Sequence, residues 1–153
     1  FVPSAGNTFT VMTYASHSGT FNTLTPLGGS CIGWTTRYDP TAVVLTAVQL
    51  PIEVDGQLVA VDRKTLTWNA SPTYPGTTYD VLRGQVPGLP VGSSPATETC
   101  LATGLTGTQT TDSTSPPARK AYWYLVRERV SGCGTGTYGK ATSGADRVST
   151  TCP

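Results

Sequence analysis

Charge and histidine are scarce in this chain. Asp, Glu, Lys and Arg together make up 12% of the 153 residues, the formal net charge is +1, and His17 is the single histidine. A chain with so little charge has no basic field to attract nucleic acid or anionic lipid, and no acidic field to hold cations. The composition therefore argues against a nucleic-acid partner and against polyanion binding in general.

Long apolar runs and helical periodicity are also missing. No run approaches the roughly 20 apolar residues that a membrane-spanning helix needs, so we expect no membrane insertion. No segment repeats its apolar residues with the period of a helix, so we expect almost no helix. The chain starts with Phe1, Val2 and Pro3 rather than Met, which favours a processed product or an excised piece.

The chain lacks the motifs of common catalytic and metal sites. No Gly-x-Ser-x-Gly or Cys-x-x-Cys motif occurs, and His17 lies in a polar turn between two serines. Most carboxylates lie beside turns or next to Arg or Lys, as Asp62 precedes Arg63, which favours surface ion pairs over a catalytic pair. Clustered oxygens around Asp112 could ligate calcium, but the segment fits an Asx turn better. We therefore expect no enzymatic activity, no cofactor and no metal.

The four cysteines are scattered along the chain, at Cys31, Cys100, Cys133 and Cys152. Zinc sites use closely spaced ligand pairs, so this spacing argues against zinc. An even, scattered set in a chain with little charge favours two disulfides and an oxidising compartment, and so an extracellular or cell-surface location. The count alone leaves three pairings open.

Threonine, glycine and proline take the place of charge, with 28, 17 and 12 residues. Threonine favours strands while glycine and proline favour turns, so the composition is typical of an all-β protein. Apolar and polar residues alternate at 65–70, 78–83 and 121–127. Alternate side chains of a strand face the same side, so each run predicts a half-buried strand. The core anchors expected from these runs are Trp68, Tyr79, Tyr124 and Val126.

A boundary between two regions is expected near residue 50, where Leu50-Pro51 starts a connector. In residues 1–50 the pattern predicts three β-strands, at 7–14, 18–24 and 41–48. In residues 51–153 it predicts seven, at 57–61, 65–70, 78–84, 97–102, 106–111, 121–130 and 146–152.

Several motifs carry a family resemblance. They are Leu66-Thr-Trp-Asn-Ala70, Tyr79-Asp-Val-Leu-Arg-Gly84, Tyr124-Leu-Val-Arg127 and Cys133-Gly-Thr-Gly-Thr-Tyr-Gly139. With them, residues 51–153 resemble the fibronectin type III-like module found near the C-termini of large secreted bacterial surface proteins. Residues 1–48 resemble the closing strands of extracellular β-solenoids, through Gly6-Asn-Thr-Phe-Thr-Val11, Gly19-Thr-Phe21 and Tyr38-Asp39. The implied fold is all-β: a fibronectin III or immunoglobulin-like sandwich preceded by a small N-terminal β-segment.

The resemblance also implies a disulfide pattern. In such a sandwich, residues 121–130 and 146–152 would be the last two strands, paired antiparallel, with Cys133 just past their shared turn. Cys152 would then lie opposite roughly residue 124, ~20 Å from Cys133 at about 3.3 Å per residue, too far for a bond. This favours pairing Cys100 with Cys133 and Cys31 with Cys152. Tyr124 takes the place of the tyrosine whose hydroxyl ties down a sandwich corner.

Trp123 points to the face opposite Tyr124, which would be the outer face of the sandwich. We expect a contact surface there, with Trp34, Phe9 and Val11 as further contact residues. Protein contact, sugar stacking and packing against the N-terminal strands are the three alternatives for Trp123.

The expected function is structural, because the aromatic strands account for a core and not for a site. We expect a non-catalytic stalk, anchor or fibre-forming subunit of a bacterial surface or secreted protein. Residues 1–15 are a candidate donor for self-association by strand addition. One alternative is an adhesion module that binds polysaccharide or another surface protein through Trp123 and Trp34. The other is an accessory domain cleaved from a secreted hydrolase.

Overall fold

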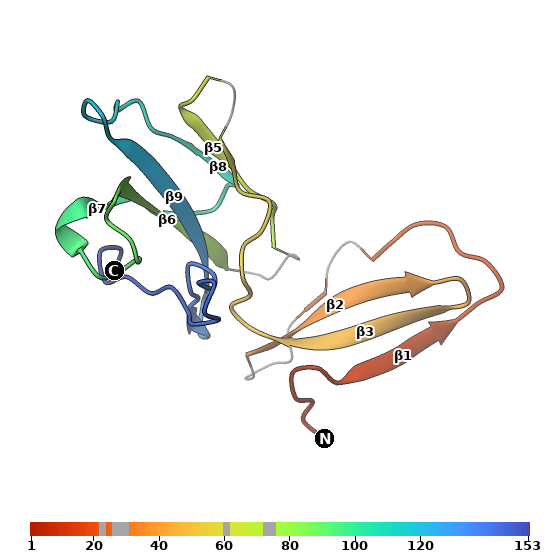
Figure 1. The fold of residues 1–153 in the computed structure, drawn as a ribbon. Helices are drawn as coiled ribbons and strands as arrows, with labels where there is room; N and C mark the ends of the chain where they lie inside the picture. Colours follow the sequence, from red (N-terminus) through yellow and green to blue (C-terminus); the bar gives the residue numbers. More distant parts are fainter. Residues whose placement is uncertain (22–23, 26–30, 60–61, 72–75) are drawn as a thin grey trace.

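The computed structural model describes residues 1–21, 24–25, 31–59, 62–71 and 76–153. Its strands pair antiparallel throughout, in one sheet near the N-terminus and two sheets further along the chain (Figure 1). The only helical element among the described residues is the short 3-10 turn η1 (Pro95–Thr97). The expected all-β, sandwich-like fold with almost no helix is therefore confirmed.

The N-terminal sheet has three strands in the order β1-β3-β2. They are β1 (Thr8–Thr13), β3 (Ala42–Gln49) and β2 (Ile32–Asp39). β2 and β3 form a hairpin in which Asp39 pairs with Ala42, so the connecting loop has only two residues. The strands expected at 7–14 and 41–48 are confirmed by β1 and β3.

The strand expected at 18–24 is wrong. Residues 18–21 and Leu24 are not in a strand, and 22–23 lie outside the described residues. The strand that pairs with β3 on its second side is β2, which the sequence pattern did not predict. Its Trp34-Thr-Thr36 stretch and Tyr38 are typical strand residues. The turn after Asp39 then brings this stretch directly alongside the Val-rich strand.

The sandwich consists of two sheets. One has the order β4-β5-β8, with β4 (Leu58–Val59), β5 (Thr65–Thr67) and β8 (Gln109–Thr111). The other has the order β10-β9-β6-β7, with β10 (Gly134–Thr135), β9 (Ala121–Val130), β6 (Thr77–Val86) and β7 (Glu98–Leu105). Six of the seven strands expected here therefore have a counterpart, although residues 60–61 of the first one lie outside the described residues.

The main core lies between these two sheets. Its buried members are Val54, Leu66, Trp68, Tyr79, Val81 and Val126. Trp68 and Tyr79 meet edge to face with ring centroids 5.5 Å apart, and Tyr124 is partly buried against the cluster. Aromatic pairs of this kind add about 0.5–1.5 kcal/mol beyond their area burial.

The seventh expected strand, at 146–152, is wrong. After β10 the chain makes a tight loop closed by a bridge between Lys140 and Asp146, and then runs on without strand structure. This C-terminal segment covers the outer face of the β9-β6 sheet, where Tyr138 and Cys152 pack on Leu82. Arg127 holds it there, because its guanidinium donates to the carbonyl oxygens of Cys152 and Pro153 at 3.0 and 3.1 Å.

The disulfide pairing inferred above is also wrong, although all four cysteines are bonded. The bonds are Cys31–Cys133 and Cys100–Cys152. Because the C-terminal segment crosses the face of the sheet, Cys152 reaches Cys100 on β7 and not the N-terminal region. Cys133 is then left to join the sandwich to Cys31, beside β2 of the N-terminal sheet.

A small junction surrounds the Cys31–Cys133 bond. Leu50 and Val130 are buried there, with Ile52 packed against them. The backbone N–H of Ile52 donates to the Glu128 carboxylate at 2.9 Å, and burial raises the pKa of Glu128. A covalent bond, an apolar cluster and a buried carboxylate thus connect the N-terminal sheet with β9.

Candidate functional site

The long edge of β9 that faces away from β6 is open over more than half of its length. β10 pairs only with Arg129 and Val130, and Gly136 adds one bond to the carbonyl of Glu128, at 2.8 Å. Backbone groups of a strand point alternately to its two sides. The backbone N–H and C=O groups of the even-numbered residues of β9 therefore point away from β6. Among the described residues, no backbone group pairs with those of Tyr122 or Tyr124 on this side.

Gln57 blocks one point of this edge. Its side-chain oxygen accepts the outward N–H of Val126 at 3.1 Å. A side chain thus occupies a position that a neighbouring strand would fill in a complete sheet. Exposed strand edges are usually covered, charged or bulged, and β9 keeps an unbroken register with β6 from Ala121 to Val130.

A groove of about 220 Å³ runs beside the open edge, between the two sheets. It is lined by Gln57, Val59, Leu66, Thr67, Tyr122, Trp123, Tyr124 and Val126. Leu66 and Val126 belong to the main core, so this groove leads from solvent to the core. Backbone donors and acceptors at its rim and apolar walls inside are what an added strand needs.

A buried carboxylate holds one wall of the groove. Asp112 follows β8, accepts the Tyr124 hydroxyl at 3.1 Å and pairs with Arg83 at 2.7 Å. Its Asx turn with the backbone N–H of Thr114, at 2.9 Å, is the one expected from the sequence. Tyr124 therefore ties down the β8–β9 connection through a side chain, whereas the tyrosine of the resembled fold bonds to backbone.

The same contacts shift two pKa values. Burial alone would raise the pKa of Asp112, but hydrogen bonds from Thr114, Arg83 and Tyr124 outweigh it and hold the pKa at about 2. Burial and the bond to Asp112 raise the pKa of Tyr124 to about 12. The carboxylate is thus charged and the phenol neutral at all physiological pH values, as a structural anchor requires.

Trp123 does not form the exposed surface that its register suggested. It lies on the face opposite Tyr124, but the C-terminal segment covers that face and packs the indole near Leu82 and Tyr138. Gly84 on β6 makes the close approach possible, because a Cβ there would overlap the indole ring. Trp123 is therefore partly buried instead of exposed, and its packing partner is the C-terminal segment and not the N-terminal strands.

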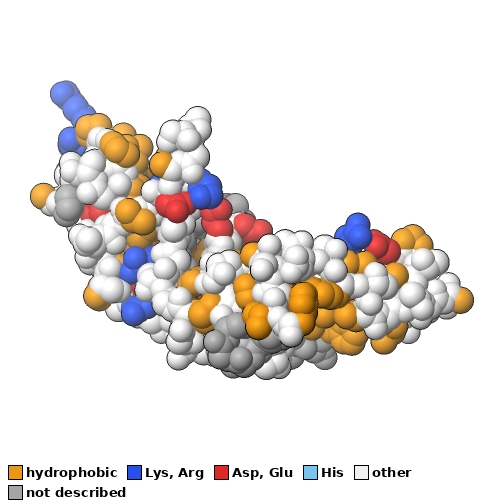
Figure 2. All heavy atoms as spheres, turned by 90° about the horizontal axis from the view of Figure 1, so that it is seen from below, with side chains coloured by type: hydrophobic (Ala, Val, Ile, Leu, Met, Phe, Trp, Pro, Cys, Tyr) orange, Lys and Arg blue, Asp and Glu red, His pale blue; other side chains and the backbone are white. Residues whose placement is uncertain are grey.

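Two of the other expected contact residues do come together. On the N-terminal sheet the rings of Phe1, Phe9 and Trp34 form a row, with neighbouring centroids 5.9 and 5.7 Å apart. Figure 2 shows hydrophobic side chains gathered over this part of the molecule. Val11 is 49% exposed on β1. The structure separates all of these residues from Trp123, which lies in the sandwich.

No cluster of metal ligands accompanies these features in the described residues. His17 stacks on Tyr38 with ring centroids 5.3 Å apart and contacts Tyr14. Across the described ranges, three or more His, Cys, Asp or Glu side chains nowhere gather as metal ligands. Nor does that part of the chain contain a helix long and apolar enough to cross a membrane.

The open edge and its groove could not be read from the sequence. Gln57, Arg83 and Asp112 gave no pattern that links them, and β9 becomes an edge only because the C-terminal segment passes over the sheet. Comparisons with protein-family models, curated proteins and solved structures found no significant match to this chain.

Proposed function

We propose that this protein is a non-catalytic structural module of a secreted or surface-displayed protein, which joins its neighbours by β-strand addition at the open edge of β9. The observation that carries the proposal is the outward backbone of Tyr122 and Tyr124, which has no partner among the described residues and lies beside a groove that reaches the core. Two disulfides are compatible with an extracellular location. Under this proposal residues 51–153 act as the fibronectin III-like acceptor.

The donor in this proposal is β1 of a second copy. β1 is an edge strand of its sheet, and most of its side chains are exposed, including Val11 and Met12 at 49% and 50%. Its six residues are long enough to pair with the open part of β9, residues 121–125, up to the point where Gln57 binds the N–H of Val126. The N-terminal sheet extends away from the sandwich (Figure 1), so head-to-tail addition would produce a chain of molecules.

A proline at an outward-facing N–H tests the acceptor edge. Tyr122→Pro removes a donor that nothing in the described residues uses, and edge strands tolerate proline there. Tyr122→Thr removes the same ring and keeps the N–H, so it is the matched control. We expect concentration-dependent chains for the wild type and for Tyr122→Thr, and monomers for Tyr122→Pro, by light scattering after gel filtration and by negative-stain microscopy.

A synthetic peptide of residues 1–15 tests the donor. In excess it should cap the acceptor edge and shorten the chains, whereas a scrambled peptide of the same composition should not. A wild-type protein that remains monomeric at every concentration, or chains that survive Tyr122→Pro, would refute the proposal.

A further inference from the structure

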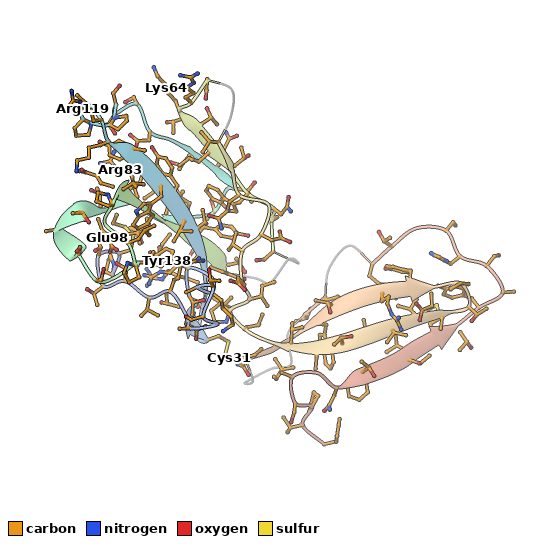
Figure 3. All side chains as sticks on the ribbon, viewed as in Figure 1. Cys31, Lys64, Arg83, Glu98, Arg119 and Tyr138 are labelled. Atoms are coloured by element: carbon orange, nitrogen blue, oxygen red, sulfur yellow. A yellow bond between two sulfur atoms is a disulfide. The ribbon has the colours of Figure 1, made fainter. Side chains whose placement is uncertain are left out.

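Four cations gather at the end of the sandwich that is remote from the N-terminal sheet. Arg63 and Lys64 lie in the turn before β5, and Arg119 and Lys120 lie just before β9. A backbone bond of 2.8 Å from Asp112 to the Lys64 carbonyl joins the two loops at their base. Figure 3 shows Lys64 and Arg119 at the same end. We call these four residues the cationic tip.

The four cations of the tip form no ion pair within the described residues, although Lys64 interacts electrostatically with nearby Asp62. The described residues include every acidic residue of the chain, and none of the four cations forms an ion pair with one of them. The nearest carboxylate in the sequence, Asp62, is engaged by the backbone N–H groups of Lys64 and Thr65, both at 2.9 Å. The small net charge of the whole chain therefore conceals a local excess of positive charge.

Two of these cations occupy backbone conformations that arginine rarely adopts. The φ angles of Arg63 and Arg119 are +60° and +63°, in the left-handed region that favours Gly or Asn. Such a residue costs roughly 1–2 kcal/mol, and strained positions of this kind concentrate at functional sites. Both loops thus keep a charged side chain at a position where an uncharged Gly or Asn would be more stable.

A cleft of about 480 Å³ opens between the two loops. It is lined by Asp62, Arg63, Lys64, Ser113, Thr114, Ser115, Pro116, Tyr122 and Tyr124. Arg83 lies over the Tyr122 ring at 4.4 Å, and the Tyr122 hydroxyl donates to the Ser115 carbonyl at 3.3 Å. The aromatic wall is therefore held from two sides, which is the preorganisation that a binding surface benefits from.

The geometry points to an acidic polysaccharide as the ligand of this cleft, with carboxylate groups on its sugar rings. Lysine and arginine supply the charge that carboxylates need. The hydroxyls of Ser113 and Ser115 match the hydroxyls of a sugar, and the Tyr122 ring offers a flat surface for its apolar face. This binding would attach the module to an anionic glycan, at a cleft that shares Tyr122 and Tyr124 with the edge proposed for strand addition.

A pair of double variants with equal loss of charge tests the site. Arg63→Asn with Lys64→Gln removes two tip cations, and asparagine suits the left-handed conformation of residue 63. Arg37→Gln with Lys140→Gln removes two cations that lie elsewhere and have ion-pair partners. Binding of polygalacturonate and of neutral dextran to the full chain is measured by calorimetry at low and at physiological salt.

We expect the wild type to bind polygalacturonate and not dextran, with weaker binding at the higher salt concentration. The tip variant should bind about tenfold more weakly, because two exposed ion pairs together contribute on the order of 1 kcal/mol or slightly more. The control variant should bind like the wild type. Absence of wild-type binding, an equal loss in both variants, or equally tight binding of an oligonucleotide of matched charge would overturn the proposal.

Discussion

Asp112 offers the sharpest test of how this fold is stabilised. Its carboxylate is 4% exposed, pairs with Arg83, and accepts hydrogen bonds from Thr114 and Tyr124. These contacts join β6, the β8–β9 connection and β9. Replacing Asp112 with Asn keeps the size of the side chain and removes its charge, so the substitution isolates the electrostatic part of these contacts.

The magnitude follows from the pKa. A carboxyl group whose pKa falls from the ordinary 3.8 to about 2 on folding stabilises the folded state at neutral pH by about 2 kcal/mol. Since the folded pKa is lower, this stabilisation is present in full above about pH 5 and is lost as the pH falls through about 2. Asp112→Asn should therefore lower the free energy of unfolding by about 2 kcal/mol at pH 7 and by less than about 0.5 kcal/mol at pH 2.

Urea unfolding of both proteins at pH 7, 4, 3 and 2 measures the difference. Urea is preferred to guanidinium chloride because added salt would screen the charges. The matched control is Asp146→Asn, which removes an exposed carboxylate paired with Lys140 and should cost less than about 1 kcal/mol. A wild-type advantage over Asp112→Asn that stays constant between pH 7 and pH 2 would show that the charge of Asp112 is not what stabilises the fold.

Two further substitutions have defined outcomes. Burial raises the pKa of Glu128 above 4.5, so the folded state holds this proton more tightly and the free energy of unfolding falls as the pH rises above that value. In urea unfolding, Glu128→Gln should therefore be more stable than the wild type at pH 8 but not at pH 4. A stability gain that is larger at pH 4 would contradict this. Gly84→Ala should lower the free energy of unfolding by about 1–3 kcal/mol, because its methyl group meets the Trp123 indole. Gly107→Ala faces open space and should leave thermal unfolding nearly unchanged. An equal loss of stability in both variants would mean that Trp123 does not pack against Gly84.

The alternation of apolar and polar residues predicted the strands well where a strand lies on each side of them in the sheet, as for β6 and β9. The run around Tyr79 became β6 and the run around Tyr124 became β9, each with its apolar face toward the main core. Alternation is a property of consecutive residues, so it survives in any tertiary context that buries one face of the strand. The N-terminal hairpin was assigned less well, because Ile32–Asp39 was overlooked in favour of a Gly- and Thr-containing stretch.

The end of the chain could not be predicted in this way. Residues 146–152 had two possible positions, the open edge of β9 and the outer face of the same sheet. On the face, Arg127 holds the last two carbonyls and also forms a buried ion pair with Asp80 at 2.9 Å. These contacts of Arg127 and the disulfide between Cys100 and Cys152 join residues far apart in the chain, so no local sequence pattern predicts them.

The sequence by itself determined that this is an all-β, disulfide-bonded protein of low charge, because composition and alternation act residue by residue. Only the tertiary structure decided which cysteines meet, which face of β9 is covered and which edge is left open, because each depends on where the C-terminal segment lies. The total charge follows from the sequence, whereas its distribution follows from the tertiary structure. The total is small and can be counted from the sequence, but folding brings Lys64 and Arg119 to one end of the sandwich, where their fields add.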